Sequence, residues 1–184
     1  MEQQKKKSTF RDFVEALIIA LIIALPIKYF IASPFIVRQT SMFPTFKDGD
    51  YLIVDKLGYR FNTPQRGDVV VFNPPFKEDT YYIKRIIALP GETIEIKNNI
   101  VKIINSENPE GFILEEKYIS STRGDTVVQK LEQNEYFVMG DNRAASSDSR
   151  NWGPLLFDHI SGKAVIRLFP ISNIDYMPGS IEKI

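Results

Sequence analysis

The sequence contains no cysteine and a single histidine, His159. Without cysteine, the chain has no disulfide bond, no thiolate metal site and no cysteine nucleophile. With one histidine, a histidine-rich metal cluster is excluded, and a Ser-His-Asp triad would depend on His159 alone. We therefore expect no metal ion and no cofactor.

The chain also lacks a net charge, since 23 lysine and arginine residues balance 23 aspartate and glutamate residues. Proteins that bind nucleic acids present a basic surface, so this balance argues against a nucleic-acid partner. A length of 184 residues suits one ordinary core or two small ones once an N-terminal segment is set aside. No internal repeat or low-complexity tract divides the chain, so we expect one main domain.

The N-terminal segment is the only long apolar part of the sequence. A basic cluster, Lys5 to Arg11, precedes the run Ala16 to Ile27. A helix that rises about 1.5 Å per residue needs about 20 residues to cross a bilayer, and Phe13 to Ala32 has that length if Glu15 and Lys28 lie at the two interfaces. The pattern predicts a transmembrane anchor over 13–33, with 1–12 in the cytoplasm and 34–184 outside it.

Two other interpretations of the apolar segment are a cleaved signal peptide and a buried core helix. A cleaved signal peptide needs a small-x-small site after the apolar run, and the only candidate, Ser33, is followed by Pro34. A core helix would carry a polar face, whereas Ala16 to Ile27 is apolar all around. Both patterns favour a retained anchor.

From Pro34 onward, short runs of Val, Ile, Tyr and Phe alternate with Gly, Pro, Asn and Asp, which is typical of a mainly β domain with mostly antiparallel strands. Asn98-Asn99 predicts a hairpin turn between two of these runs. The more polar stretch 105–133 predicts a small insertion or subdomain. We expect strands at Phe35 to Arg38, Asp50 to Asp55, Asp68 to Phe72, Tyr81 to Ala88, Thr93 to Lys97, Ile100 to Ile104, Glu135 to Met139 and Lys163 to Phe169.

Ser41 lies in a segment, Gln39 to Thr45, that follows a predicted strand and contains an internal proline. A serine on such a turn can direct both its hydroxyl and its own N–H at one carbonyl group. A lone serine in a turn usually has only a turn-forming role. A catalytic interpretation of Ser41 therefore requires a partner that can take its proton.

Lys84 is a cation in a predicted strand that is otherwise apolar. The period of two places Lys84 on one face with Tyr82 and Ile86, and Arg85 on the other face. The lysine either protects an edge strand from aggregation or is a buried amine. Burial lowers the pKa of an amine by penalising its charged form, which would make Lys84 a base near pH 8.

Two further segments stand out. Arg66 to Phe72 is a turn that leads into a strongly apolar strand, and we interpret it as core. Gly140 to Gly153 combines hydroxyl groups with charges of both signs in one loop after a strand. The loop is either a hydrophilic surface loop or a hydrogen-bonded network that supports a site.

These segments, after a membrane anchor, resemble in order the characteristic boxes of type I signal peptidases. The matching segments are SMFPT, RGDVVVF, YYIKRIIALPGE and GDNRAASSDSRNWG. The resemblance implies a mostly antiparallel β-sheet or barrel catalytic domain of the signal peptidase type, with Ser41 as nucleophile and Lys84 as general base. It also implies that Ser146 orients the Lys84 amine.

Further roles follow from the same resemblance. Asp148 and Arg150 would form a supporting ion pair, with a further contact to Arg85. In this family the substrate binds as an extended strand, and small pockets accept the small side chains of an Ala-x-Ala site. The resemblance places these residues at the pockets: Phe35, Val37, Met42, Tyr82 and Ile83.

The resemblance is less complete at the oxyanion hole. It implies that the Ser41 N–H is one donor. Part of the family has a serine or glycine two residues before the nucleophile, where this chain has Gln39. A side-chain N–H of Gln39 would then supply the second donor. The family requires no histidine, so we interpret His159 as a surface or capping residue.

The resemblance implies a membrane-bound serine endopeptidase that removes signal peptides from exported preproteins at the outer face of the cytoplasmic membrane. Its partners would be those signal peptides and membrane lipid, and the sequence predicts no oligomeric state. Two alternatives are a LexA-like self-cleaving Ser-Lys protease and a membrane-tethered β-barrel binding module without catalysis. The binding module predicts that Ser41 and Lys84 lie far apart or in solvent, so their distance separates these hypotheses.

Overall fold

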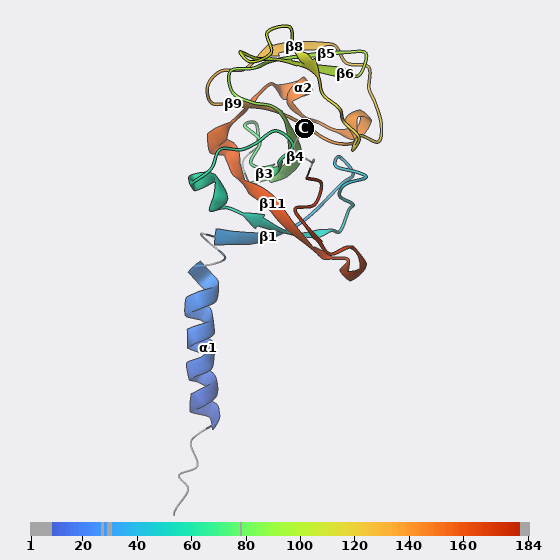
Figure 1. Cartoon of the computed structure of the whole chain (residues 1–184). Helices are drawn as coiled ribbons and strands as arrows, with labels where there is room; N and C mark the ends of the chain where they lie inside the picture. Colours follow the sequence, from blue (N-terminus) through green and yellow to red (C-terminus); the bar gives the residue numbers. More distant parts are fainter. Residues whose placement is uncertain (1–8, 27, 29–30, 78, 181–184) are drawn as a thin grey trace, which may run out of the picture.

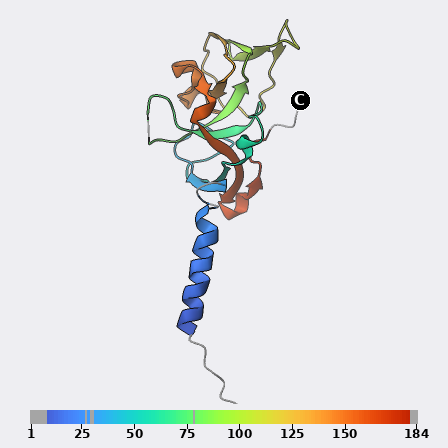
Figure 2. The ribbon, with the colours of Figure 1, turned by 90° about the vertical axis from the view of Figure 1, so that its left-hand side faces the viewer.

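The computed structural model describes residues 9–26, 28, 31–77 and 79–180. A single long helix, α1 (Thr9–Pro26), extends away from a body built of β-strands, as two perpendicular views show (Figures 1 and 2). The mainly β, mostly antiparallel body that the sequence predicts is therefore present.

Helix α1 has 18 residues and exposes its apolar side chains. Among the described residues, no helix has both the length and the apolar content that crossing a bilayer requires. Arg11, Asp12 and Glu15 occupy its first turns. The predicted anchor 13–33 continues beyond α1 into residues 27, 29 and 30, which lie outside the described residues, as do lysines 5–7 of the basic cluster.

The larger sheet has eight strands in the order β1-β2-β11-β3-β4-β9-β10, with β12 beside β11. Every pairing within it is antiparallel. Its strands are β1 (Ala32–Ile36), β2 (Tyr51–Asp55), β3 (Val69–Phe72), β4 (Tyr82–Ala88), β9 (Glu135–Met139), β10 (Leu155–Leu156), β11 (Ile160–Phe169) and β12 (Asp175–Tyr176).

The smaller sheet has four strands in the order β7-β6-β5-β8, namely β5 (Thr93–Lys97), β6 (Ile100–Ile104), β7 (Phe112–Ile113) and β8 (Val127–Lys130). Asn98 and Asn99 form the turn between β5 and β6, both with a positive φ, which confirms the predicted hairpin. The stretch 105–133 contributes β7 and β8 to this sheet. Short helical segments complete the fold: η2 (Gly58–Arg60), η3 (Arg143–Ala145), α2 (Ser149–Trp152), η4 (Phe157–His159) and η5 (Ile171–Asn173).

All the strands expected from the sequence are present, with ends displaced by a few residues. The unexpected strands are β7, β8, β10 and β12, which have between two and four residues. Strands this short give no readable alternation of apolar and polar residues, so their pairing depends on neighbouring strands.

Two apolar clusters of the larger sheet hold the elements that carry the site. One contains Val37, Met42, Phe46 and Leu52, and it secures the chain just after β1. The other contains Val70, Phe72 and Ile86, and it fixes β3 against β4. A third cluster lies between β4, β9 and the smaller sheet. Because Ile83 of β4 packs against the cluster of Val37, Met42 and Phe46, core packing sets the position of β4 relative to the turn after β1.

Candidate active site

Ser41 lies on a tight turn that begins where β1 ends. The chain enters the turn through Gln39, whose φ is 70°, and the N–H of Phe43 donates to the carbonyl of Thr40 at 3.0 Å. Met42, which is 1% exposed, anchors the turn in the core. The Ser41 side chain is thereby held at the surface of the core, in a groove.

Lys84 reaches the same point from the middle of the larger sheet. Its amine donates to Ser41 Oγ at 2.9 Å and to the carbonyl of Ile83 at 2.9 Å. The Tyr82 ring centroid is 5.3 Å from the amine. Since β4 lies between β3 and β9, Lys84 is not on an edge strand, and the aggregation-protection interpretation is wrong.

Burial makes the protonated Lys84 side chain unusually acidic. The side chain is 4% exposed. Burial lowers the pKa of Lys84 from 10.5 to about 8, although the charges of Asp148 and Asp141 partly oppose this shift. Near pH 8, a large fraction of the amine is neutral and can accept the proton of the Ser41 hydroxyl.

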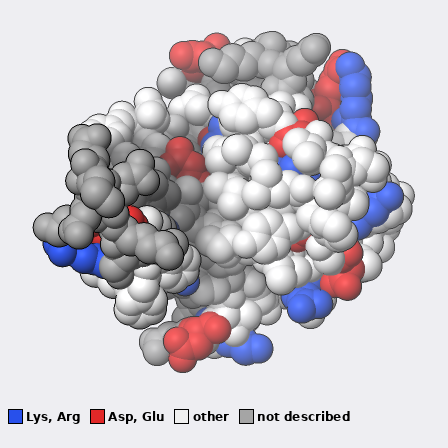
Figure 3. Space-filling model, turned by 90° about the horizontal axis from the view of Figure 1, so that it is seen from below, with Lys and Arg blue, Asp and Glu red and all other residues white. Residues whose placement is uncertain are grey.

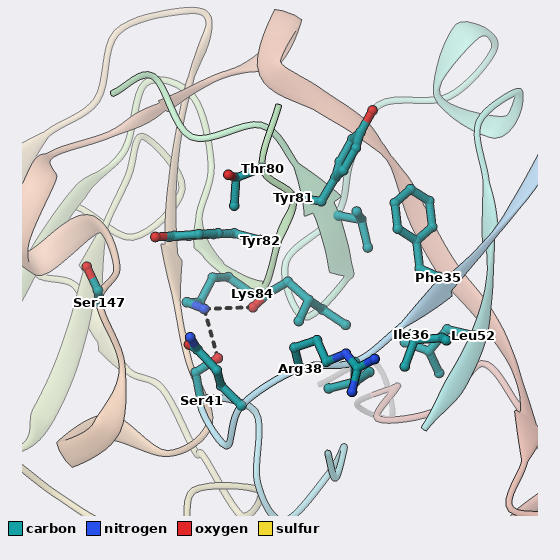
Figure 4. Close-up of a pocket in the computed structure, with 14 residues that line it drawn as sticks. Phe35, Ile36, Arg38, Ser41, Leu52, Thr80, Tyr81, Tyr82, Lys84 and Ser147 are labelled. Carbon is teal, nitrogen blue, oxygen red and sulfur yellow. Dashed lines mark hydrogen bonds between the residues drawn. The ribbon is translucent and has the colours of Figure 1, made fainter. Parts of the chain in front are cut away.

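The two side chains open onto a groove of about 270 Å³ (Figure 4). One wall is formed by the chain from Phe35 to Gln39 and the other by the chain from Thr80 to Lys84. The rings of Phe35 and Tyr81, with centroids 5.0 Å apart, lie in contact away from the serine. Leu52, Val71 and Ser147 complete the lining.

Most residues that the resemblance assigns to substrate binding lie along this groove. Phe35, Val37, Tyr82 and Ile83 are part of its lining. Met42 is not, since its side chain packs beneath the turn with Val37 and Phe46. Gln39 lines the groove near Ser41, and its backbone N–H donates to Asp48 at 2.9 Å.

The sequence reasoning did not single out several other lining residues, among them Arg38, Leu52 and Thr80. Arg38 follows Val37 in the strand-like stretch, so the alternation of side chains offered a signal for it. Leu52 and Thr80 offered none, because their place at the groove depends on which strands become neighbours.

The loop after β9 forms a hydrogen-bonded network behind Ser41. Asp148 is fully buried, and its carboxylate accepts from the Arg150 side chain at 2.8 and 2.9 Å and from the Gly140 N–H at 3.0 Å. Burial alone would raise the pKa of Asp148, but the hydrogen bonds and charge of Arg150 outweigh it, and the pKa is lowered. Arg150 also contacts Asp125 at 2.6 Å.

Ser146 is 4% exposed, and its hydroxyl forms no well-aligned hydrogen bond with the described residues, although it is close enough to the Asp148 carboxylate to help lower the pKa of Asp148. It lies beside Gly140, where an added Cβ would overlap both Ser146 Oγ and the carbonyl oxygen of Ser41. The loop therefore packs directly against the turn that holds Ser41. The hydrogen bonds described for the Lys84 amine are with Ser41 and Ile83, and do not include Ser146.

Arg85 is not part of the Asp148 pair. Its guanidinium forms a buried ion pair with Asp141 at 2.6 Å, with both side chains 0% exposed. The Tyr118 ring lies 4.0 Å from the guanidinium, and the carbonyl oxygens of Gly67 and Gly179 accept from it. Because β-strand alternation sends Arg85 to the face opposite Lys84, the two cations have separate partners.

A serine hydroxyl within hydrogen-bond distance of a buried, partly neutral amine is the arrangement that a serine hydrolase with a lysine base requires. The 2.9 Å separation of Ser41 and Lys84 contradicts the binding module without catalysis, which predicts distant or solvated side chains. His159 lies in η4 and is not among the residues that line the groove.

Comparison with known proteins identifies the family. The model of the family described as "Signal peptidase, peptidase S26" matches residues 10–169. The chain therefore belongs to the signal peptidase family, peptidase S26.

Named relatives cover most of the chain. The chain is 38% identical over 170 residues to "Probable signal peptidase I-1" of Synechocystis, covering 88% of this chain and 84% of that protein. It is 38% identical over 176 residues to "Signal peptidase I P" of Bacillus subtilis subsp. natto, covering 92% and 94%. A crystal structure of a signal peptidase I from Enterococcus faecalis aligns with 56% of this chain and 98% of that chain, with 28% identity and a TM-score of 0.48.

Proposed function

We propose that the protein is a membrane-bound serine endopeptidase that cleaves N-terminal signal peptides from exported preproteins after small-x-small sites. Ser41 is the nucleophile and Lys84 is its general base. The observation that carries this proposal is the 2.9 Å hydrogen bond between the Lys84 amine and the Ser41 hydroxyl, at the base of a groove lined largely by apolar residues.

Neutral Lys84 takes the proton of Ser41 as Oγ attacks the carbonyl carbon of the scissile peptide bond. The resulting ammonium group returns that proton to the leaving amine, which leaves the signal peptide as an ester on Ser41. Lys84, neutral again, then takes a proton from a water molecule as its oxygen attacks the ester carbonyl. When the ester bond breaks, the Lys84 ammonium group returns that proton to Ser41 Oγ, which restores the hydroxyl and the neutral amine.

The Ser41 N–H is the first donor to the developing oxyanion. None of the described backbone hydrogen bonds uses it, and the same turn holds it beside the hydroxyl. Gln39 lines the groove next to Ser41, and its side-chain amide supplies the second donor. Two donors directed at one oxygen stabilise the charge that forms only during the reaction.

The groove suits an extended peptide with small side chains. β1 is the terminal strand of the larger sheet, so its outer edge is open to pairing with a substrate strand. Val37 and Ile83 belong to opposite walls, the Tyr82 ring lies beside the Lys84 amine, and the Phe35 ring lies further along, against Tyr81. Large side chains in the walls leave small spaces, which favours alanine-sized residues in the substrate.

Asp148, Arg150 and Ser146 support the pair from behind. The bonds from Arg150 and Gly140 fix the Asp148 carboxylate, which holds the loop that packs against the Ser41 carbonyl. The Ser146 hydroxyl is buried on this loop, near the Asp148 carboxylate. If its side chain rotates toward Lys84, it can accept from the third N–H of the protonated amine and so orient it.

Membrane attachment through 13–33 agrees with the surface of the protein. Leu17, Ile18, Ile22 and Ile23 of α1 are 49–66% exposed, and apolar side chains of this kind favour a non-aqueous surrounding. Seen from the α1 end, most of the surface is uncharged, and acidic and basic side chains lie mainly toward its rim (Figure 3). The basic cluster Lys5 to Arg11 supports an orientation with the N-terminus in the cytoplasm and the β body on the outer face of the membrane.

The test is cleavage of a reporter preprotein by the purified full chain in detergent. Ser41→Ala and Lys84→Met each abolish cleavage while the near-UV circular dichroism stays that of the folded protein, since the two groups act as one unit. The matched controls are Ser172→Ala in η5 and Lys97→Met in β5, both exposed and away from the groove, and both keep full activity. Measurable cleavage by Ser41→Ala would remove the assignment.

A further inference from the structure

Arg38 introduces a permanent charge into the groove. Its exposed side chain lines the groove, on the Ile36 side of Ser41 (Figure 4). The described part of the chain offers the guanidinium no ion pair and no hydrogen bond. Among the described residues that line the groove, Lys84 is the only other charged one, and none is acidic. A charged group of a bound peptide would therefore meet no acidic competitor for Arg38 within this lining.

The backbone on either side of Arg38 shows which way its side chain points. The N–H of Val37 donates to the carbonyl of Asp50 at 2.9 Å, so the backbone groups of Val37 face inward to β2. Hydrogen-bonding directions alternate along an antiparallel strand, so the backbone groups of Ile36 and Arg38 face the open edge. Side chains alternate between the two sheet faces, and Val37 is buried while Ile36 and Arg38 are exposed.

A substrate strand added at this edge obeys the same alternation. In a small-x-small site, the two small side chains share one face, and the walls formed by Val37 and Ile83 place them on the inner face. The middle residue then points to the outer face, where it lies beside Ile36 and Arg38. Side chains opposite each other on one face have Cβ atoms about 4.5–5.5 Å apart, and diagonal neighbours about 7–8 Å, both within reach of an arginine.

We propose that Arg38 is a specificity-determining residue that favours an acidic side chain at the middle position of the small-x-small site. The inference rests on the proposed function, because it assumes that the peptide segment before the cleaved bond occupies this groove. The Arg38 guanidinium pairs with the carboxylate of aspartate or glutamate at that position, and it disfavours lysine or arginine there.

The experiment uses peptides that differ only at the middle residue, which is Glu, Gln or Lys. Initial rates with the full chain in non-ionic detergent, without lipid, give kcat/KM for each peptide. Exposed ion pairs are weak, so kcat/KM for the Glu peptide should exceed that for the Gln peptide by about two- to five-fold. The kcat/KM for the Lys peptide should fall below that for the Gln peptide by a similar factor. In about 1 M salt, where the Debye length is about 3 Å, the preference should shrink toward one.

Variants assign the preference to Arg38. Arg38→Gln should bring the Glu to Gln ratio of kcat/KM to about one. Arg38→Glu should reverse the order, so that the Lys peptide is cleaved fastest, and a double-mutant cycle isolates this coupling. The matched control is Arg60→Gln, because Arg60 is exposed in η2 and does not line the groove. It should keep the wild-type ratios.

Failure of this inference differs from failure of the proposed function. If the wild type cleaves none of the peptides, the endopeptidase function fails and the inference fails with it. If it cleaves all three with equal kcat/KM, or if Arg38→Gln keeps the acidic preference, the function stands and the role of Arg38 is wrong. An effect of Arg38→Gln seen only with anionic vesicles, and equal for every peptide, would assign Arg38 to lipid headgroups and overturn the proposal.

Discussion

The buried amine of Lys84 ties the activity of the protein to pH. A lysine base works only when neutral, and burial lowers its pKa to about 8. Below this pH the neutral fraction falls tenfold per unit, so about one tenth of the free enzyme is competent at pH 7. We expect kcat/KM for a neutral reporter peptide to rise through pH 7 to 8 and to level off near pH 9.

The same shift predicts how stability depends on pH. In the unfolded chain the Lys84 side chain keeps its proton up to about pH 10.5, whereas in the folded protein it loses that proton near pH 8. Below about pH 8 both states are protonated, and burying the charged amine destabilises the fold by roughly 3 kcal/mol, at about 1.4 kcal/mol per pKa unit. Between pH 8 and 10.5 the unfolded state binds more protons, so this penalty shrinks as pH rises.

Lys84→Met removes the charge and keeps a similar side-chain length. At pH 7, urea unfolding should therefore give the variant an equal or higher free energy of unfolding, with a gain below about 3 kcal/mol because the hydrogen bonds of the amine are also lost. At pH 10 the gain should disappear. Comparing the two proteins at each pH cancels the titration of the other groups.

Two results would refute this reasoning. One is a pH limb of kcat/KM near 6.5 that vanishes in His159→Ala, since the single histidine would then be the base. The other is an Lys84→Met variant that is less stable than the wild type by several kcal/mol at pH 7, which would mean that the amine is buried as a stabilising, paired cation.

Two further predictions concern the elements that hold the pair. Gly140→Ala should lower kcat by at least about tenfold with little change in far-UV circular dichroism, because its new Cβ overlaps Ser146 Oγ and the Ser41 carbonyl and displaces the nucleophile turn. Wild-type kcat in Gly140→Ala would show that the loop and the turn move independently. Asp141→Asn should reduce the free energy of unfolding in urea by about 3–5 kcal/mol, since it leaves Arg85 buried without its charged partner. A decrease in the free energy of unfolding below about 1 kcal/mol would mean that Tyr118 and the carbonyl groups of Gly67 and Gly179 are enough to stabilise the buried charge of Arg85.

The strands of the fold could be predicted from the sequence because most of them repeat apolar residues with a period of two. Val69 to Phe72 is an exception, since it is apolar throughout and buried on both faces, yet its length and preceding turn still indicated a strand. Strand order was not predictable. β11 lies between β2 and β3 although more than a hundred residues separate it from β2, and no local pattern specifies such a pairing.

The Ser41 and Lys84 pair shows how far the resemblance extended the local reasoning. The residues are 43 positions apart, and each had an ordinary structural interpretation on its own. The turn chemistry of Ser41 and the alternation around Lys84 showed what each side chain could do, but the resemblance was needed to join them. The physical link is the core cluster that contains both Met42 and Val69, since Val69 and its neighbour Val70 pair with Arg85 and Lys84.

Met42 and Arg38 both differ from the sequence reasoning. The resemblance assigned Met42 to a substrate pocket by its motif, whereas its side chain turns inward to anchor the turn. Arg38 was not singled out from the sequence, although it lines the groove and still follows the alternation of the strand. The backbone reversal comes one residue later, at Gln39 with φ of 70°, and beyond it the alternation no longer predicts side-chain directions such as that of Met42. The positions around such a reversal are therefore where variants such as Arg38→Gln give information that the sequence alone does not contain.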